Sequence, residues 1–276
     1  GVLKALEKSA FKITYARIGS EPTPLAIDNI TAENRAILPD AIIAIGGGSS
    51  IDAGKAISAM LTVEQPVRDF LEGVGSFKHP GTKLTFIAVP TTSGTGSEAT
   101  SNAVISQTGK NGFKRSIRHE NFVPDMAIID PLLVKDCPPE ITAHSGMDAF
   151  TQLVESYLSI KSQPITDCLA LEGITNIRDS LIDAVKDGND ILARTRMSYA
   201  ALLSGITLAN AGLGLVHGFA SSVGAYTNIP HGIVCGTLMG VVNRFTIDKL
   251  LLQNESSVPR EKYAAIGRIL SRQPDL

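Results

Sequence analysis

Tryptophan is absent from the sequence, and cysteine is scarce. The three cysteines, Cys137, Cys168 and Cys235, are odd in number, far apart and in no C-x-x-C spacing. This pattern argues against both a disulfide framework and a thiolate zinc site, so we expect ordinary reduced thiols. The chain also lacks an apolar run of the roughly 18 residues that a membrane-spanning helix needs.

Excess charge of either sign is missing as well. Twenty-five basic and 27 acidic side chains give a formal net charge of −2, which provides no positive field to hold nucleic acid. The opening residues GVLKALEKSAFK lack the apolar core and cleavage site of a signal peptide. These absences argue against nucleic acid and membranes as partners and predict a soluble, cytoplasmic protein.

The composition is that of a globular protein, with 43% hydrophobic and 19% charged residues over 276 positions. The first half contains three short apolar runs, at residues 41–45, 83–90 and 126–130. Continuous apolar runs are typical of strands that are buried on both faces of a parallel sheet. Small and apolar residues over 51–61 predict a helix between the first two strands, which makes a βα unit.

The second half shows helical periodicity and no convincing strand. Pro138 and Pro139 mark a stop followed by a helix start, so we place a domain boundary there. The sequence predicts an α/β domain over 1–137 and an all-helical domain over 138–276. We expect helices at about 142–158, 163–182, 190–211, 214–227, 231–246 and 260–272.

A glycine-rich loop lies between the first strand and its helix. Gly46, Gly47, Gly48 and Ser49 follow the strand directly, and Asp52 lies in the first helical turns. Glycines allow close approach of an anion, and the free N–H groups and dipole of the helix supply positive potential. We interpret the segment as a phosphate site, although a tight strand-to-helix turn would also use these glycines.

A second polar loop follows the strand that ends at Pro90. It reads TTSGTGSEAT over residues 91–100 and is rich in hydroxyl groups. On its own it could be a surface connection. Both loops, however, follow the carboxyl ends of apolar strands, which is where ligands bind in open α/β sheets. Together they predict a nucleotide site.

The helical half contains candidate metal ligands. Asp148 and Gln152 are four residues apart and share one helix face, while His217 and His231 lie among apolar residues. Asp148 and the two histidines could hold Fe or Zn with an open position for substrate. Alternatively, each histidine donates to a backbone carbonyl in the core. The remaining histidines have polar surroundings, and we expect them on the surface or in loops: His79, His119 and His144.

Six segments occur in an order that is familiar: DAIIAIGGGSSIDAGKAI, FIAVPTTSGTGSEAT, FVPDMAIIDP, GMDAFTQLVESY, GLVHGFA and IPHGIVCGTLM. Between about residues 37 and 239 the sequence resembles the iron-containing (group III) alcohol dehydrogenases of the dehydroquinate synthase-like superfamily. The resemblance implies a Rossmann-like domain for NAD or NADP, a helical domain for a metal, and a cleft between them for hydride transfer.

The resemblance also implies roles for single residues. Gly47, Gly48 and Ser49 match the pyrophosphate-binding positions. The second cofactor loop is matched by Thr91, Thr92 and Thr95, and the cofactor-facing lysine by Lys114. Three of four metal ligands are matched by Asp148, His217 and His231, and the two histidines are implied in catalysis. Gln152 stands where the family has a fourth ligand, a histidine, and Ser221 stands where many members have another histidine.

The ends of the chain also depart from the family pattern. An opening strand–helix–strand and several closing helices of the family have no counterpart, so we expect a part of a longer protein with an incomplete sheet edge. Glu21, Pro22 and Thr23 replace the asparagine-proline of the cofactor cleft.

The resemblance implies an NAD(P)-dependent alcohol dehydrogenase or aldehyde reductase, with a divalent metal as Lewis acid and a small alcohol or aldehyde as substrate. We expect a homo-oligomer, most simply a dimer. Three alternatives stay open: a metal-independent reductase similar to maleylacetate reductase, a lyase of the dehydroquinate synthase type, and a cofactor-binding protein without turnover. Gln152 favours the first alternative, and the scarcity of Arg and Lys near the histidines disfavours the second.

Overall fold

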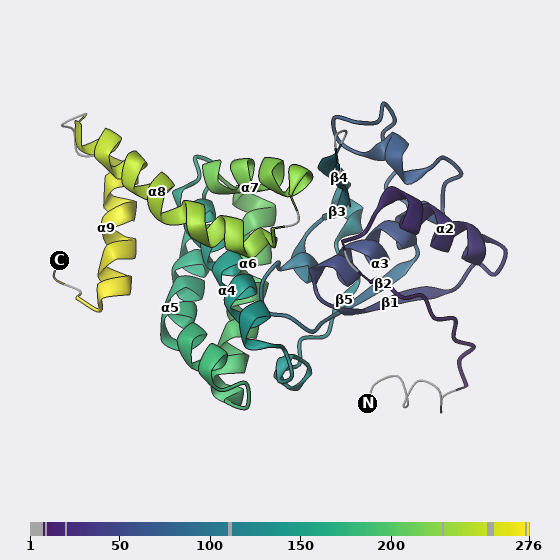
Figure 1. Ribbon diagram of the computed structural model, residues 1–276, viewed down its shortest axis with the longest axis horizontal. Helices are drawn as coiled ribbons and strands as arrows, with labels where there is room; N and C mark the ends of the chain where they lie inside the picture. The colour runs from purple at the N-terminus through teal and green to yellow at the C-terminus, as the bar shows by residue number, and fades with distance from the viewer. Residues whose placement is uncertain are drawn as a thin grey trace.

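A computed structural model of the chain describes residues 8, 10–19, 21–109, 112–227, 229–252, 257–273 and 275. An α/β region and a helical region lie side by side, joined between β5 and α4 (Figure 1). The predicted order, an α/β half followed by a helical half, is confirmed. The domain boundary at residues 137 and 138 stays a prediction.

The α/β region is built on a parallel sheet in the order β1-β2-β5. In the register of the strands, Ile43 pairs with Ile87, and Ile87 pairs with Met126. Helix α3 packs on β1 and β2, and α2 packs on α3. The elements are α2 (Pro24–Arg35), β1 (Ala41–Gly46), α3 (Gly48–Met60), β2 (Thr85–Pro90) and β5 (Met126–Ala127).

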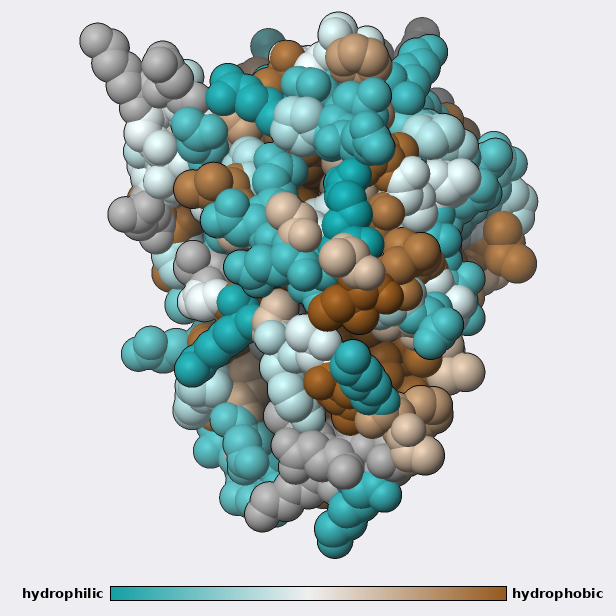
Figure 2. Space-filling model, turned by 90° about the vertical axis from the view of Figure 1, so that its right-hand side faces the viewer, coloured by the Kyte–Doolittle hydropathy of each residue, from teal (hydrophilic) through white to brown (hydrophobic). Residues whose placement is uncertain are grey.

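The expectation that these strands are buried on both faces is wrong. Ala44 and Phe86 face α3 and are buried, but Ile43 is 43% exposed and Met126 is 54% exposed. Among the residues described, α3 covers one face of β1 and β2, and no other long helix packs on them. Figure 2 shows the end of the molecule formed by the α/β region, where hydrophobic side chains lie at the surface between polar ones.

An antiparallel hairpin, which the sequence analysis missed, follows the second polar loop. It consists of β3 (Asn102–Gln107) and β4 (Phe113–Arg118), with Asn102 opposite Arg118. The glycines Gly109 and Gly112 between two strand-like runs were the available signal. The hairpin packs against α3 on one side and α7 on the other. Short 3-10 helices complete this region: η1 (Val67–Phe70), η2 (Ser97–Ala99), η3 (Glu120–Phe122) and η4 (Pro131–Val134).

His79 is not a surface residue as expected. It is 7% exposed and packs edge-on between Phe70 and Phe122, with ring centroids 5.1 and 5.0 Å away. The polar neighbours in its sequence hid this contact, because the aromatic partners come from distant segments. His119 and His144 are half-buried.

The helical region contains all six predicted helices, each within a few residues of its expected bounds. Helices α4, α5 and α6 pack on one another around Leu153, Ile174 and Met197, and α7 and α8 lie across them (Figure 1). Among the described residues, no single helix is long and apolar enough to span a membrane; α6 and α7 pass that test only as a pair, which is bent by 101°. The helices are α4 (Pro139–Leu158), α5 (Pro164–Lys186), α6 (Ile191–Ala211), α7 (Leu215–Tyr226), α8 (His231–Leu252) and α9 (Val258–Ser271).

The two regions meet where the second polar loop touches α6. Gly96 has a left-handed backbone with φ of 61°, and a Cβ at this position would lie 2.5 Å from Gly205 Cα. A Cβ at Gly205 would in turn lie 2.2 Å from the Gly96 oxygen. Ser93 Oγ and Ser198 Oγ add a hydrogen bond of 3.0 Å. The loop therefore connects the sheet directly to the helical region.

Candidate metal and cofactor site

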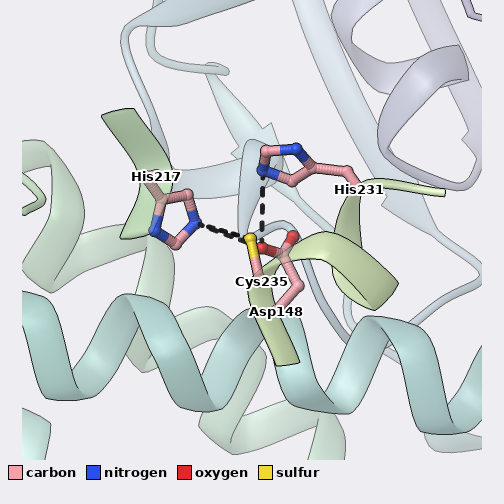
Figure 3. Close-up of side chains that lie close together, drawn as sticks. All are labelled: Asp148, His217, His231 and Cys235. Carbon is pink, nitrogen blue, oxygen red and sulfur yellow. Dashed lines mark hydrogen bonds and ion pairs between the residues drawn. The ribbon is translucent and has the colours of Figure 1, made fainter. Parts of the chain in front are cut away.

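Four side chains from three helices converge in the helical region. Asp148 comes from α4, His217 from α7, and His231 and Cys235 from α8 (Figure 3). Their ligand atoms all lie within 4.8 Å of one another. Asp148 Oδ1 is 3.2 Å from His217 Nε2 and 3.8 Å from His231 Nε2, and Cys235 Sγ is 3.8 Å from His217 Nε2. We call these four residues the metal cluster.

Small residues bring the helices close enough for this convergence. Gly232, the second residue of α8, lies directly against α4, where a Cβ would lie 1.9 Å from the His144 oxygen. His231 and Cys235 are four residues apart and therefore share one face of α8. The first turn of α8 thus directs both side chains toward Asp148.

Glu155 orients His217 from the other side. Its carboxylate accepts the Val216 N–H at 2.6 Å and lies 2.6 Å from His217 Nδ1. It contacts the amino end of α7, where a negative charge is favourable, and a Cβ at Gly214 would lie 2.8 Å from it. With the Nδ1 proton donated to Glu155, Nε2 of His217 faces the metal cluster as a lone-pair donor.

Burial is the largest influence on the pKa of each cluster member. It raises the pKa of the Cys235 thiol and lowers that of His231. At Asp148 burial is outweighed by His217 and His231, so the pKa of this carboxyl lies below its ordinary value. At His217 burial is outweighed by hydrogen bonds with Asp148, Cys235 and Glu155, so its pKa is raised. Asp148 and His217 therefore each favour the charged form of the other.

The residues fit a divalent metal. Metal–ligand bonds of about 2.0–2.3 Å in a tetrahedron separate neighbouring ligand atoms by roughly 3.3–3.8 Å, which agrees with the 3.2 and 3.8 Å separations found here. Two imidazoles, a carboxylate and a thiol are the donors that zinc takes in proteins. His231 Nδ1 is buried without a hydrogen-bond partner in the described chain.

Gln152 is not engaged with the metal cluster through its oxygen. It is 4% exposed, and its Oε1 accepts a hydrogen bond of 2.7 Å from Ser204 Oγ on α6. A ligand role for Gln152 stays a prediction. Cys235, expected as an ordinary thiol, instead lies fully buried in the cluster, and its spacing of four from His231 was the available signal. Glu155 was also missed, although it lies two turns after Asp148 on the same helix.

The two polar loops lie side by side at the carboxyl end of the sheet. The Thr91 N–H donates to the Gly46 oxygen at 2.9 Å. A Cβ on Gly47 would lie 3.3 Å from Thr92, and one on Gly48 would lie 2.5 Å from Thr95. These contacts bring together the residues expected to bind a nucleotide.

The amino end of α3 is open to an anion. Gly47 is the N-cap of α3 and offers no side-chain acceptor. The first turn contains Ser49 and no acidic residue. The first N–H groups of a helix need such an acceptor, and a phosphate supplies one. The geometry therefore fits the pyrophosphate of a dinucleotide.

Asp52 and Lys55 fix the second loop to α3. The Asp52 carboxylate accepts hydrogen bonds from Ser97 Oγ and, at 3.0 Å, from the Val104 N–H. Lys55 is fully buried and donates to the oxygens of Ser97, Thr100 and Asn102 at 2.7–2.8 Å. Both Asp52 oxygens have protein partners, so its cofactor contact stays a prediction.

Lys114 lies on β4 and forms an ion pair with a residue that had no assigned role. Its Nζ is 2.8 Å from Glu21 Oε1, and the second Glu21 oxygen accepts from Ser106 Oγ at 2.5 Å. Both charges act on the pKa of His231, so the pair lies within electrostatic range of the metal cluster. Glu21 thus partly neutralises the expected cofactor-facing lysine.

Two family models match the chain. The model described as iron-containing alcohol dehydrogenase matches residues 1–131, and the model for the C-terminal part of the Fe-containing alcohol dehydrogenase family matches residues 142–274. Together they span both regions of the fold. The resemblance inferred from the six sequence segments is confirmed.

Known proteins agree with these matches. Alcohol dehydrogenase 4 of Saccharomyces cerevisiae is 40% identical over 86% of this chain and 62% of its own length. An alcohol dehydrogenase from Oenococcus oeni superposes with a TM-score of 0.87 at 33% identity, covering 99% of this chain and 68% of that one. Sulfoacetaldehyde reductase from Bifidobacterium kashiwanohense, solved with NAD+, superposes with a TM-score of 0.82 at 27% identity, covering 99% and 73%. The chain spans about three fifths of the yeast protein.

Proposed function

The chain belongs to the iron-containing alcohol dehydrogenase family, and we propose that it acts as an NAD(P)-dependent alcohol dehydrogenase or aldehyde reductase. The observation that carries the proposal is the pairing of two sites. A cluster of Asp148, His217, His231 and Cys235 lies in the helical region, and the open amino end of α3 lies at the sheet edge. The relatives named as alcohol dehydrogenases and the NAD+ complex support the same conclusion.

The cofactor loops have a binding task in this proposal. Gly47 and Gly48 leave space for the pyrophosphate, while Ser49 lies in the first turn of α3 with its N–H groups. Thr92 and Thr95, which touch the glycines, offer hydroxyls to the cofactor. Lys114 adds a positive charge that is shared with Glu21. Contacts of Gly46, Asp52 and Thr91 with the cofactor belong to the same proposal.

The metal cluster has an orienting task. Asp148, His217 and His231 would hold a divalent cation, which supplies a Lewis acid that favours the alkoxide form of the substrate. Glu155 keeps the His217 proton on Nδ1, so that Nε2 stays available. Buried Asp148 carries the negative charge that balances the cation. A bound nicotinamide would supply the donor or acceptor of the hydride.

Small alcohols or aldehydes are the substrates that we propose, because the named relatives act on such compounds. A homodimer and a cytoplasmic location remain part of the proposal. Light scattering of the purified chain tests the first, and fractionation of cells tests the second.

The decisive experiment combines metal analysis with oxidation of NADH and NADPH against a panel of small aldehydes. We expect one divalent metal per chain and turnover with one of the two cofactors. Stable cofactor binding without any turnover would instead favour a binding protein. Metal-free turnover at the full rate would favour the maleylacetate reductase type.

A glycine variant tests the cofactor site separately. Gly47→Val would push its side chain against Thr92, where even a Cβ lies at 3.3 Å. We expect NAD(P)H affinity to fall about tenfold or more, equal to about 1.4 kcal/mol. The matched control is Gly267→Val on α9, where a Cβ meets nothing within 4 Å. Unchanged affinity in folded Gly47→Val protein would contradict the assignment.

A further inference from the structure

The metal cluster contains one possible ligand, Cys235, that the sequence analysis did not assign to the metal. A glutamine at position 152 can ligate only through its amide oxygen, and Oε1 already accepts a hydrogen bond from Ser204. Ser204 Oγ is also 3.4 Å from the Gly94 oxygen in the second polar loop. Position 152 therefore helps to connect α4 and α6 at a point that lies near that loop.

Cys235 lies where a ligand is missing. Its side chain is fully buried, and its sulfur lies among the oxygen of Asp148 and the ring nitrogens of His217 and His231 (Figure 3). We propose that Cys235 is the fourth protein ligand and that its sulfur makes the centre prefer zinc or cobalt over iron, relative to an all-nitrogen-and-oxygen site. The inference rests on the proposed function only in assuming that the cluster holds a metal.

The backbone supports this assignment independently of the side-chain distances. Cys235 and His231 are one helical turn apart, so both can bind the same ion without a change in α8. Helix α8 packs closely on α4 here, because a Cβ at Gly232 would lie 1.9 Å from the His144 oxygen and one at Gly236 would lie 3.3 Å from Met147. The sulfur is therefore held at its present depth in the cluster.

The chemistry of the donors gives the metal preference. Binding replaces the thiol proton by the metal: the S–H bond breaks, the sulfur electron pair forms the S–metal bond, and a proton leaves to solvent. Thiolate and Asp148 carboxylate together balance the charge of a divalent ion. Thiolate is a soft donor that suits zinc, whereas an imidazole at this corner would give a site better suited to iron. Substrate would then enter as a fifth ligand, which zinc allows.

The test uses the full chain stripped of metal and titrated with Co2+. A cobalt–thiolate bond gives an intense charge-transfer absorption in the near ultraviolet, which carboxylate and imidazole do not give. We expect this absorption in the parent and in Cys168→Ser, whose thiol is exposed and remote. We expect it to vanish in Cys235→Ser, with zinc affinity lowered about a hundredfold.

Two further measurements keep the proposal open to contradiction even where Cys235→Ser folds poorly. X-ray absorption of the zinc-loaded parent should show one sulfur at about 2.3 Å. In anaerobic competition, Cys235→His should take up more iron relative to zinc than the parent does.

The outcomes separate this inference from the proposed function. Cobalt bound without the near-ultraviolet absorption, or an absorption that survives Cys235→Ser, would show that Cys235 only donates a hydrogen bond within the cluster, and the metal centre would stand. No binding of cobalt or zinc by any variant would overturn both the inference and the metal part of the proposed function. Cofactor binding, measured separately, would then still test the nucleotide site.

Discussion

Two groups of buried charges lie on either side of the junction between the α/β region and the helical region. They differ in whether their polar atoms have hydrogen-bond partners elsewhere in the protein. The first, which we call the lysine cluster, consists of Asp52, Lys55, Ser97 and Thr100. Every polar contact of Lys55 goes to an oxygen of the protein, and both oxygens of Asp52 are also satisfied. In the metal cluster, by contrast, ligand atoms face one another, and His231 Nδ1 has no partner in the described chain.

This difference separates structure from function among buried charges. Burying a charge is costly in both places, so each must be compensated. The polar atoms of the lysine cluster find their partners within the protein. The metal cluster is compensated by a proton or by a cation from outside, so its chemistry depends on what is bound.

The comparison is tested most strongly at the two histidines. His217→Ala and His231→Ala should each lower turnover about a thousandfold, because a Lewis acid worth several kcal/mol is lost. Metal content should fall with turnover, while NAD(P)H affinity should change little. His144→Ala on α4, outside the cluster, is the matched control. If either histidine is only a core residue, its variant would lose about 1–3 kcal/mol of stability and keep full activity per folded molecule.

Removing the central charge of the lysine cluster should affect stability rather than chemistry. Lys55→Met leaves three backbone oxygens without their donor and removes the positive charge near buried Asp52, so the free energy of unfolding should fall by about 3–5 kcal/mol. Chemical denaturation measures this change. Metal binding per folded molecule should persist, and its loss would mean that the two clusters are coupled.

The same variant tests how the free energy of unfolding depends on pH. Burial lowers the pKa of Lys55 from 10.5 to about 8. Between these values the unfolded chain binds more protons than the folded chain, so this lysine makes the free energy of unfolding rise with pH. The difference between parent and Lys55→Met should therefore grow from about pH 8 to about pH 10.5. A constant difference would contradict the lowered pKa.

A change at Glu155 should affect the metal cluster less than a change at either histidine does. Glu155→Gln removes the charge that fixes the His217 proton on Nδ1, and we expect metal affinity to fall about 10–100-fold. Isothermal titration with zinc measures it. Glu33→Gln, exposed on α2, is the control for a lost carboxylate. Equal affinities of the two variants would remove Glu155 from the site.

How much the sequence could predict depends on the distance over which each signal acts. Helices such as α4 and α8 follow from local periodicity, and the glycine loop follows from four adjacent residues. Asp148, His217 and His231 were named because each stands in a recognisable segment, and the structure brings them together. These parts needed only local information or family likeness.

The missed features depend on contacts between distant segments. Nothing near Glu21 in sequence shows that it pairs with Lys114, 93 residues away. The exposed face of β1 was also missed, because an apolar run shows the potential for burial and not whether a helix is present to cover it. Gln152 was expected at the metal because it stands at the family's fourth-ligand position, and this role stays a prediction; its hydrogen bond with Ser204 could not be foreseen, because Ser204 lies on another helix.

The smallest effect on stability is expected at Glu21, because this charged side chain is partly exposed to solvent. Its side chain is 48% exposed, so pairing with Lys114 contributes less than about 1 kcal/mol to stability. Although partial burial opposes it, Lys114 lowers the pKa of Glu21 below 4.5, so this contribution is present above pH 4.5 and is lost as the pH falls through the lowered pKa. Glu21→Gln should free the charge of Lys114 for the anionic cofactor, which would tighten NAD(P)H binding a few-fold and make it more sensitive to salt. The double variant Glu21→Gln with Lys114→Met should lose that gain. If Glu21→Gln weakens cofactor binding instead, the carboxylate holds Lys114 in position for the cofactor, and the pair belongs with the internally compensated charges of the lysine cluster.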